Sequence, residues 1–210
     1  MSGRRAVAVA ALEARFQLGS PLLWALAAFA VFATLAINPA AMIPTGEAAV
    51  GGLQPEANSR LALAQVMALS GLIFYTFPAA ILAGQAALRD DEAAVGPLLH
   101  ATPLRPAEHV AGKLAGVLLA LAVVACGHTL LAMAWHGWGR HVGSTLVVGP
   151  LAPGHYVSAA ALFLAPGLAL CVALGFGLGE RTRSPLAVYA VPSVLFPLFL
   201  AGNIPRPASA

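Results

Sequence analysis

The side chains best suited to bind a partner or take part in chemistry are concentrated between positions 89 and 113. Charges crowd the start of this segment, an apolar pair follows, a Thr-Pro step interrupts it, and a Gly-Lys pair precedes a long apolar stretch. The residues concerned are Arg89, Asp90, Asp91, Glu92, Leu98, Leu99, His100, Thr102 and Pro103. Because acidic residues complement the dipole at a helix N-terminus, this order predicts a short helix with an acidic start and an apolar centre.

The sequence lacks the patterns that would indicate an enzyme. Nucleophilic hydrolysis needs a serine or cysteine beside a histidine and an orienting acid, but Ser70, Ser158 and Ser193 stand alone in apolar surroundings. Neither HExxH nor the phosphate-binding GxxxxGK[ST] occurs. We therefore expect no catalytic residue and no cofactor, and any ATPase would have to be a separate subunit.

Six histidines raise the question of a metal site. His128 lies within an apolar stretch, where a neutral imidazole bonded to a neighbouring helix is the simpler interpretation. His136, His141 and His155 share one side of the predicted fold, but no i,i+4 pair or carboxylate completes a metal site. The two cysteines lie in apolar runs and are expected to pack as small apolar side chains. No metal ion is expected.

The elements that must hold these side chains are membrane-spanning helices. Hydrophobic residues make up 60% of the chain and charged residues 9%, against roughly 25% charged in soluble domains. A helix needs about 20 mostly apolar residues to cross the hydrocarbon. The stretches that meet or approach this length are 21–37, 61–88, 110–135, 157–179 and 185–202. We predict an all-α, polytopic transmembrane bundle of about five spans, forming one domain over residues 1–210.

Prolines and glycines inside these stretches predict local irregularities. Pro78 is expected to kink the second span, because proline removes a backbone hydrogen bond and clashes with the preceding turn. Pro166, Pro192 and Pro197 fall in the last two spans, either as packing kinks or as breaks along a substrate path. The glycine-rich run 175–179 favours close helix packing.

Residues 1–20 predict a short interfacial helix before the first span. Val9, Leu12 and Phe16 fall near one face at helical spacing, and Glu13 and Gln17 fall elsewhere. A secretory signal peptide fits less well, because the basic part is long and no small-x-small cleavage site flanks the apolar run.

The lysines and arginines orient the chain, since cytoplasmic segments carry an excess of them. With the N-terminus inside, the outer side holds Arg60, Arg140 and Arg206. The cytoplasmic side holds the other eight, which are Arg4, Arg5, Arg15, Arg89, Arg105, Lys113, Arg181 and Arg183. Lys113 lies within a turn of a span end, so its side chain is expected to reach water. The prediction is a multi-pass protein of the cell membrane with a cytoplasmic N-terminus. Nucleic acid is not an expected partner, because the basic residues form no dense patch.

Two of these patterns together resemble the permease subunits of ABC-2 type ATP-binding-cassette transporters. The first is Arg-Asp-x-Glu, then Leu-Leu-x-x-Thr-Pro-Leu, then Gly-Lys before an apolar span. The second is the run from Glu13 to Pro21, which is similar to the interfacial helix before span one in those permeases.

The resemblance implies a membrane subunit of an exporter whose partners are a separate ABC ATPase subunit and a second permease subunit, within the lipid bilayer. The 89–109 segment would contain a coupling helix that docks on the ATPase. The acidic residues 90–92 would be charged contacts or helix-entry residues, residues 98–100 the docking face, and Thr102-Pro103 the terminator.

Several alternatives stay open. The family usually has six spans and both termini inside, so the chain would be a fragment or a short form, or residues 136–155 would hide a membrane excursion. The 89–109 segment would otherwise be a loop whose charges only set the topology. The alternative function is a non-transporting scaffold or assembly subunit. A small intramembrane enzyme is disfavoured by the missing acid–base groups.

Overall fold

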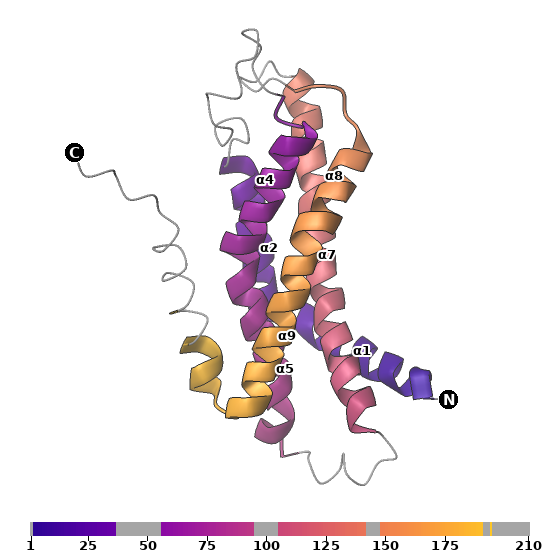
Figure 1. The fold of residues 1–210 in the computed structure, drawn as a ribbon, viewed down its shortest axis with the longest axis vertical. Helices are drawn as coiled ribbons and strands as arrows, with labels where there is room; N and C mark the ends of the chain where they lie inside the picture. Colours follow the sequence, from indigo (N-terminus) through magenta and orange to yellow (C-terminus); the bar gives the residue numbers. More distant parts are fainter. Residues whose placement is uncertain (1, 37–55, 95–104, 142–147, 191–193, 195–210) are drawn as a thin grey trace, which may run out of the picture.

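The computed structural model describes residues 2–36, 56–94, 105–141, 148–190 and 194, and the regular structure in these residues is helical throughout (Figure 1). Residues 185–190 form a further helical segment. The labelled elements are α1 (Ser2–Leu18), α2 (Pro21–Ala36), α4 (Arg60–Ser70), η3 (Gly71–Tyr75), α5 (Thr76–Glu92), α7 (Pro106–His141), α8 (Pro153–Ala159), η4 (Ala160–Leu164) and α9 (Ala165–Thr182). The predicted all-α fold is confirmed for this part of the chain.

Three long helices are apolar enough to cross a membrane. They are Arg60–Asp90, Pro106–Gly139 and Pro153–Thr182, and they contain the predicted spans 61–88, 110–135 and 157–179. The first and third run down the bundle in Figure 1 and the middle one runs up. Short η segments, in which the chain makes one wider π turn, interrupt the first and third without ending them.

The first predicted span corresponds to a short helix, and the fifth is described only at its start. A helix of 16 residues such as α2 extends about 24 Å, short of the roughly 30 Å hydrocarbon core. Together with α1, to which it is bent by 66°, it makes up a fourth candidate span. Most of the fifth predicted span, 185–202, lies outside the described residues. The structure thus supports three or four candidate spans, and the number five stays a prediction.

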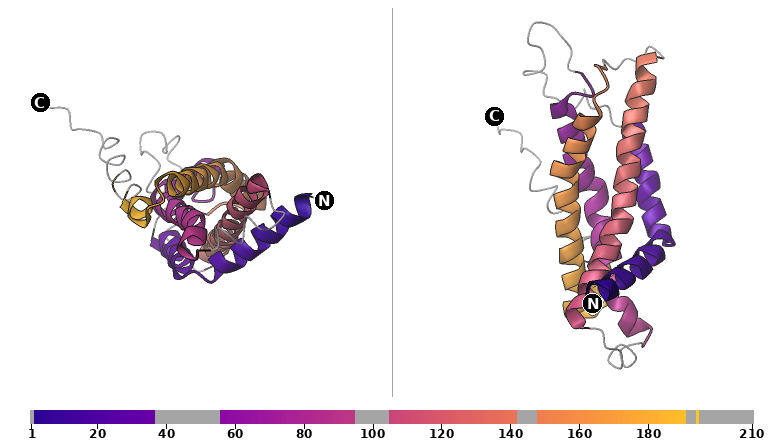
Figure 2. Two further views of the ribbon diagram at one scale, coloured as in Figure 1. Left: turned by 90° about the horizontal axis from the view of Figure 1, so that it is seen from below. Right: turned by 90° about the vertical axis from the view of Figure 1, so that its right-hand side faces the viewer.

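α1 lies across one end of the bundle and packs on α7 (Figure 2). Glycines on α7 allow the two backbones to come close. A methyl group at Gly112 would lie 2.8 Å from the Ala6 carbonyl oxygen, and one at Gly116 would lie 2.7 Å from that of Ala10. Small residues spaced in this way are typical of closely packed membrane helices.

The face of α1 that packs inward is partly polar. Glu13 and Gln17 are buried, whereas Leu12 and Phe16 are exposed at 72% and 55%. Val9, which the sequence grouped with these two, instead lies against Gly112. The apolar residues that face outward fit an interfacial helix, although its location at a membrane surface stays a prediction.

α5 and α9 also approach closely through glycines. A methyl group at Gly175 would lie 2.2 Å from the Ala80 carbonyl oxygen, and one at Gly179 would lie 2.7 Å from that of Gly84. The expectation that the 175–179 run permits close packing is confirmed for these two glycines. Gly177 differs, because nothing lies within 4 Å of the position a methyl group would take.

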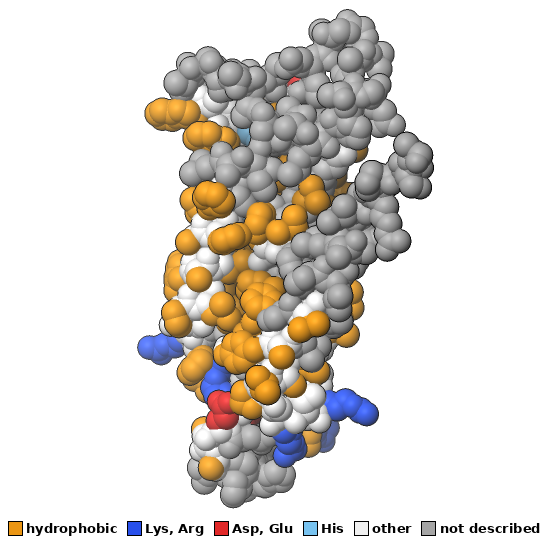
Figure 3. Space-filling model, turned by 90° about the vertical axis from the view of Figure 1, so that its left-hand side faces the viewer, with side chains coloured by type: hydrophobic (Ala, Val, Ile, Leu, Met, Phe, Trp, Pro, Cys, Tyr) orange, Lys and Arg blue, Asp and Glu red, His pale blue; other side chains and the backbone are white. Residues whose placement is uncertain are grey.

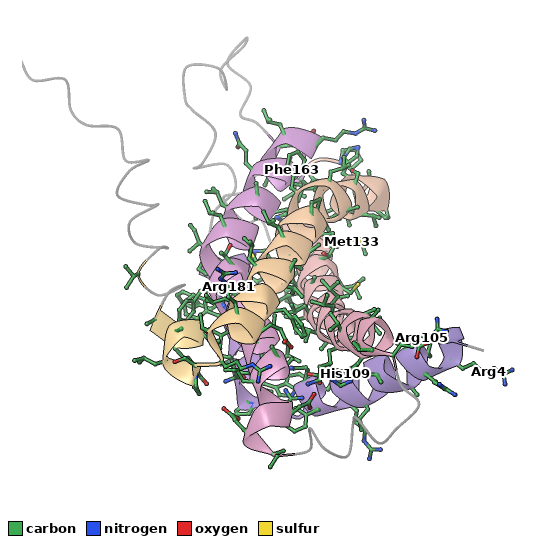
Figure 4. The ribbon with its side chains drawn as sticks, turned by 60° about the horizontal axis from the view of Figure 1, so that its bottom comes forward. Arg4, Arg105, His109, Met133, Phe163 and Arg181 are labelled. Atoms are coloured by element: carbon green, nitrogen blue, oxygen red, sulfur yellow. The ribbon has the colours of Figure 1, made fainter. Side chains whose placement is uncertain are left out.

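The basic residues gather at one end of the bundle, which we call the basic end. It is formed by α1, the end of α5, the start of α7 and the end of α9, and it carries Arg4, Arg105 and Arg181 (Figure 4). Figure 3 shows lysine, arginine and acidic side chains near this end, and many apolar side chains on the described surface above them. Arg60 begins α4 at the opposite end, called the far end.

Candidate functional site

The predicted coupling residues Arg89 and Asp90 lie on the last turns of α5, which extends past the predicted span end at 88 to Glu92. Acidic residues 90–92 therefore end a long helix, whereas the sequence suggested that they begin a short one. The apolar helix continues because Arg89 and Asp90 find partners on neighbouring helices. Glu92 is exposed. The predicted docking residues Leu98, Leu99, His100, Thr102 and Pro103 lie outside the described residues.

Asp90 holds the end of α5 to the start of α7. Its Oδ2 atom lies 2.7 Å from His109 Nε2 and 2.6 Å from Lys113 Nζ. Lys113 Nζ also donates a hydrogen bond of 2.6 Å to the Ala86 carbonyl oxygen. The expectation that Lys113 reaches water is wrong, since the residue is only 4% exposed. An ammonium so deeply buried is tolerated only when it is paired and hydrogen-bonded, and α5 supplies both partners.

Arg89 joins the same end of α5 to α1. Its Nη1 atom donates to Glu13 Oε1 and Oε2 at 3.0 and 2.8 Å. The guanidinium carbon also lies 3.5 Å from the centre of the Phe16 ring, a cation–π geometry. Gln17 Nε2 donates to Glu13 Oε1 at 2.7 Å, so the Glu13 carboxylate has two partners in a buried position.

These side chains form what we call the basal polar cluster, which comprises Glu13, Gln17, Arg89, Asp90, His109 and Lys113. It connects α1, α5 and α7 at the basic end, directly where the chain leaves α5 and returns in α7. Charge-assisted hydrogen bonds of this length are strong and directional. The cluster therefore fixes both ends of the segment that joins α5 to α7.

Sequence reasoning found only two of the six members as site residues. Glu13 and Gln17 were expected away from Val9, Leu12 and Phe16, which holds for Leu12 and Phe16 but not for Val9, and nothing indicated that the face with Glu13 packs inward. The usable signal was the pair Gly112 and Gly116, because small residues four apart on α7 predict a close helix neighbour.

Two more polar pairs lie further from the basic end. Each joins a histidine of α7 to a tyrosine of another helix. His128 Nδ1 is 3.1 Å from the Tyr75 hydroxyl of η3, and His136 Nδ1 is 2.9 Å from the Tyr156 hydroxyl of α8. The expected hydrogen bond between His128 and a neighbouring helix is confirmed. In the described ranges, no three histidine, cysteine, aspartate or glutamate side chains lie close enough together to hold a metal ion.

Comparisons with protein-family models, with curated proteins and with solved structures found no match to this chain.

Proposed function

We propose that this chain is the membrane-spanning permease subunit of an ABC-2 type exporter, working with a second permease subunit and a separate ATPase. The resemblance in the 89–113 segment supports the family. The observation that carries the proposal is the basal polar cluster. It connects both ends of the 89–109 segment, which is predicted to contact the ATPase, to α1, α5 and α7.

The cluster suits the transmission of force from an ATPase to the spans. A coupling segment on a loose loop would absorb movement instead of passing it on. Here Asp90 ties the two ends of the segment together, and Arg89 adds α1. A displacement of the segment would thus move α1, α5 and α7 as one body.

The proposal places the basic end in the cytoplasm, following the rule that basic residues stay inside. In a chain whose two cysteines are replaced by alanine, we expect a membrane-impermeant maleimide to label Arg60→Cys in intact cells. Glu92→Cys should react only after the membrane is permeabilised. Labelling of Glu92→Cys alone in intact cells would show that the chain has the opposite orientation.

The coupling assignment predicts a loss of ATPase binding when the docking face is charged. The double substitution Leu98→Asp/Leu99→Asp should abolish co-purification of the P-loop ATPase that binds the unmodified chain, because an apolar docking face does not accept two carboxylates. The measurement is an affinity purification from detergent-solubilised membranes, with the amount of inserted chain measured in parallel.

Leu151→Asp is the matched control, since Leu151 is partly exposed near the far end, and the ATPase should still co-purify. Retention of the ATPase by the Leu98→Asp/Leu99→Asp chain would refute the coupling assignment. A scaffold subunit would be indicated if no ATPase co-purified with the unmodified chain either.

A further inference from the structure

The two π turns are offset along neighbouring helices and meet where the start of η3 lies against the end of η4. η3 interrupts the helix that runs from α4 to α5, and η4 interrupts the helix from α8 to α9. A methyl group at Gly71 in η3 would lie 3.3 Å from Leu164 Cδ1 and 4.0 Å from Leu164 Cα in η4. Such turns are rare and frequently mark functional positions in helices, so two in contact are unusual.

A proline follows each π turn and explains it. The pyrrolidine ring clashes with the carbonyl group four residues earlier, which is that of Phe74 for Pro78 and that of Leu162 for Pro166, both within the π turns. The wider turn relieves this clash. Backbone bonds then reach five residues back, from the Thr76 N–H to the Gly71 oxygen and from the Ala165 N–H to the Ala160 oxygen. A π turn therefore precedes Pro78, where the sequence predicted a kink, and the kink itself stays a prediction.

The halves on either side of the π turns are held by different contacts. Toward the basic end, α5 and α9 meet backbone to backbone at Gly175 and Gly179. Toward the far end, Asn58, just before α4, donates to the Gly149 and Pro150 carbonyl oxygens at 3.1 Å and accepts from the Gly149 N–H at 2.8 Å. This ties the start of α4 to the segment before α8, so each half behaves as a unit.

An apolar groove runs beside η4, and a change in the angle between α8 and α9 would alter its width. It has a volume of about 540 Å³ and separates α7 from α8, η4 and α9. Its walls are apolar apart from Thr129, whose hydroxyl already donates to the Ala125 carbonyl oxygen at 2.8 Å. The hydrogen bond between His136 and Tyr156 holds α8 to α7.

We propose that η3 and η4 form a hinge, about which α4 and α8 tilt together relative to α5 and α9 and so open and close the groove beside α7. Hinges are short segments that absorb a change in backbone angles between rigid units, and the two π turns occupy that position in both helices. The bond between His136 and Tyr156 favours the closed form. The hinge is independent of the proposed function, since it invokes neither an ATPase nor a particular substrate.

Distances between nitroxide labels in lipid nanodiscs, measured by double electron–electron resonance, test the hinge. One sample carries Leu61→Cys and Trp138→Cys at the far end, and a second carries Ala107→Cys and Arg181→Cys at the basic end. All four residues are exposed, and the native cysteines are replaced by alanine in both samples. We expect two distances for the far-end pair and one for the basic-end pair. A single far-end distance in the otherwise unmodified chain would overturn the proposal.

Two variants sharpen the test. A π turn holds one residue more than the α-helical turn it replaces, so deleting Ala161 together with Pro166→Ala lets α8 and α9 join as one α-helix. This variant should lose the second far-end distance. Tyr156→Phe, which removes only the hydroxyl that bonds His136, should increase the population of the second distance.

Gly177→Ala is the control, because its added methyl group meets nothing within 4 Å, and its distances should match those of the unmodified chain. An unchanged distribution in Tyr156→Phe would exclude the His136–Tyr156 bond as the closing contact. If the deletion variant does not fold, the far-end distances of the Tyr156→Phe chain and of the unmodified chain still decide the test.

Discussion

Replacing Gly175 with valine is expected to destabilise the bundle by about 3 kcal/mol, at the upper end of the usual range for overpacking. Even a methyl group there would lie 2.2 Å from the Ala80 carbonyl oxygen and 2.6 Å from Ala80 Cα. These are backbone atoms, which cannot move aside as a flexible side chain does. α5 and α9 would have to separate along the contact that joins them. The measurement is the midpoint of unfolding in a detergent titration.

Gly177→Val provides the matched control for this prediction. It introduces the same β-branched residue in the same helix, one half-turn away, at a position with no neighbour within 4 Å. We expect its unfolding midpoint to stay close to that of the unmodified chain. Equal losses in the two variants would mean that helix propensity, and not the contact between α5 and α9, determines the effect.

Asp90→Asn is expected to cost about 3 kcal/mol, because it leaves the buried Lys113 ammonium without its counter-charge. The ammonium would keep its hydrogen bond to the Ala86 carbonyl oxygen, 2.6 Å from Lys113 Nζ, but no carboxylate. Removing both charges in Asp90→Asn/Lys113→Met should restore most of the lost stability, since no buried charge then remains unpaired. The free energy of unfolding of the two single variants and the double variant gives their coupling energy.

Glu92→Gln is the control for charge alone, because Glu92 is exposed on the same helix end and its substitution should be nearly neutral. Additive losses in Asp90→Asn and Lys113→Met, with no recovery in the double variant, would argue against a stabilising pair between α5 and α7.

The long helices could be predicted from the sequence because a membrane span satisfies its own backbone and needs only an uncharged apolar run. That is why 61–88, 110–135 and 157–179 coincide with described helices. The close packing at Gly175 and Gly179 was predictable in the same way, since small residues four apart in an apolar helix are typical of close helix contacts. Residue type and local spacing were enough in these cases.

The basal polar cluster could not be predicted in full because its partners are distant in the sequence. Glu13 and Arg89 are separated by 76 positions, and no periodicity within α1 or α5 indicates that they meet. Lys113 was expected to reach water because its distance from the span end allows it. Only the fold shows that Asp90 and the Ala86 carbonyl oxygen are nearer partners.

The π turns also combine a local feature that the sequence predicts with a long-range contact that it does not. Pro78 predicted a kink, because the clash of the proline ring is local. The contact of the π turn before Pro78 with the π turn before Pro166 depends on how the two helices pack, and the sequence alone does not contain that information.

ATP hydrolysis in proteoliposomes that contain this chain and the P-loop ATPase that co-purifies with it tests the proposed function most directly. We predict faster turnover with the unmodified chain than with the ATPase alone, and a return to the rate of the ATPase alone with the Leu98→Asp/Leu99→Asp chain. Identical turnover with the unmodified chain and without any chain would contradict the proposal that this protein is an exporter subunit.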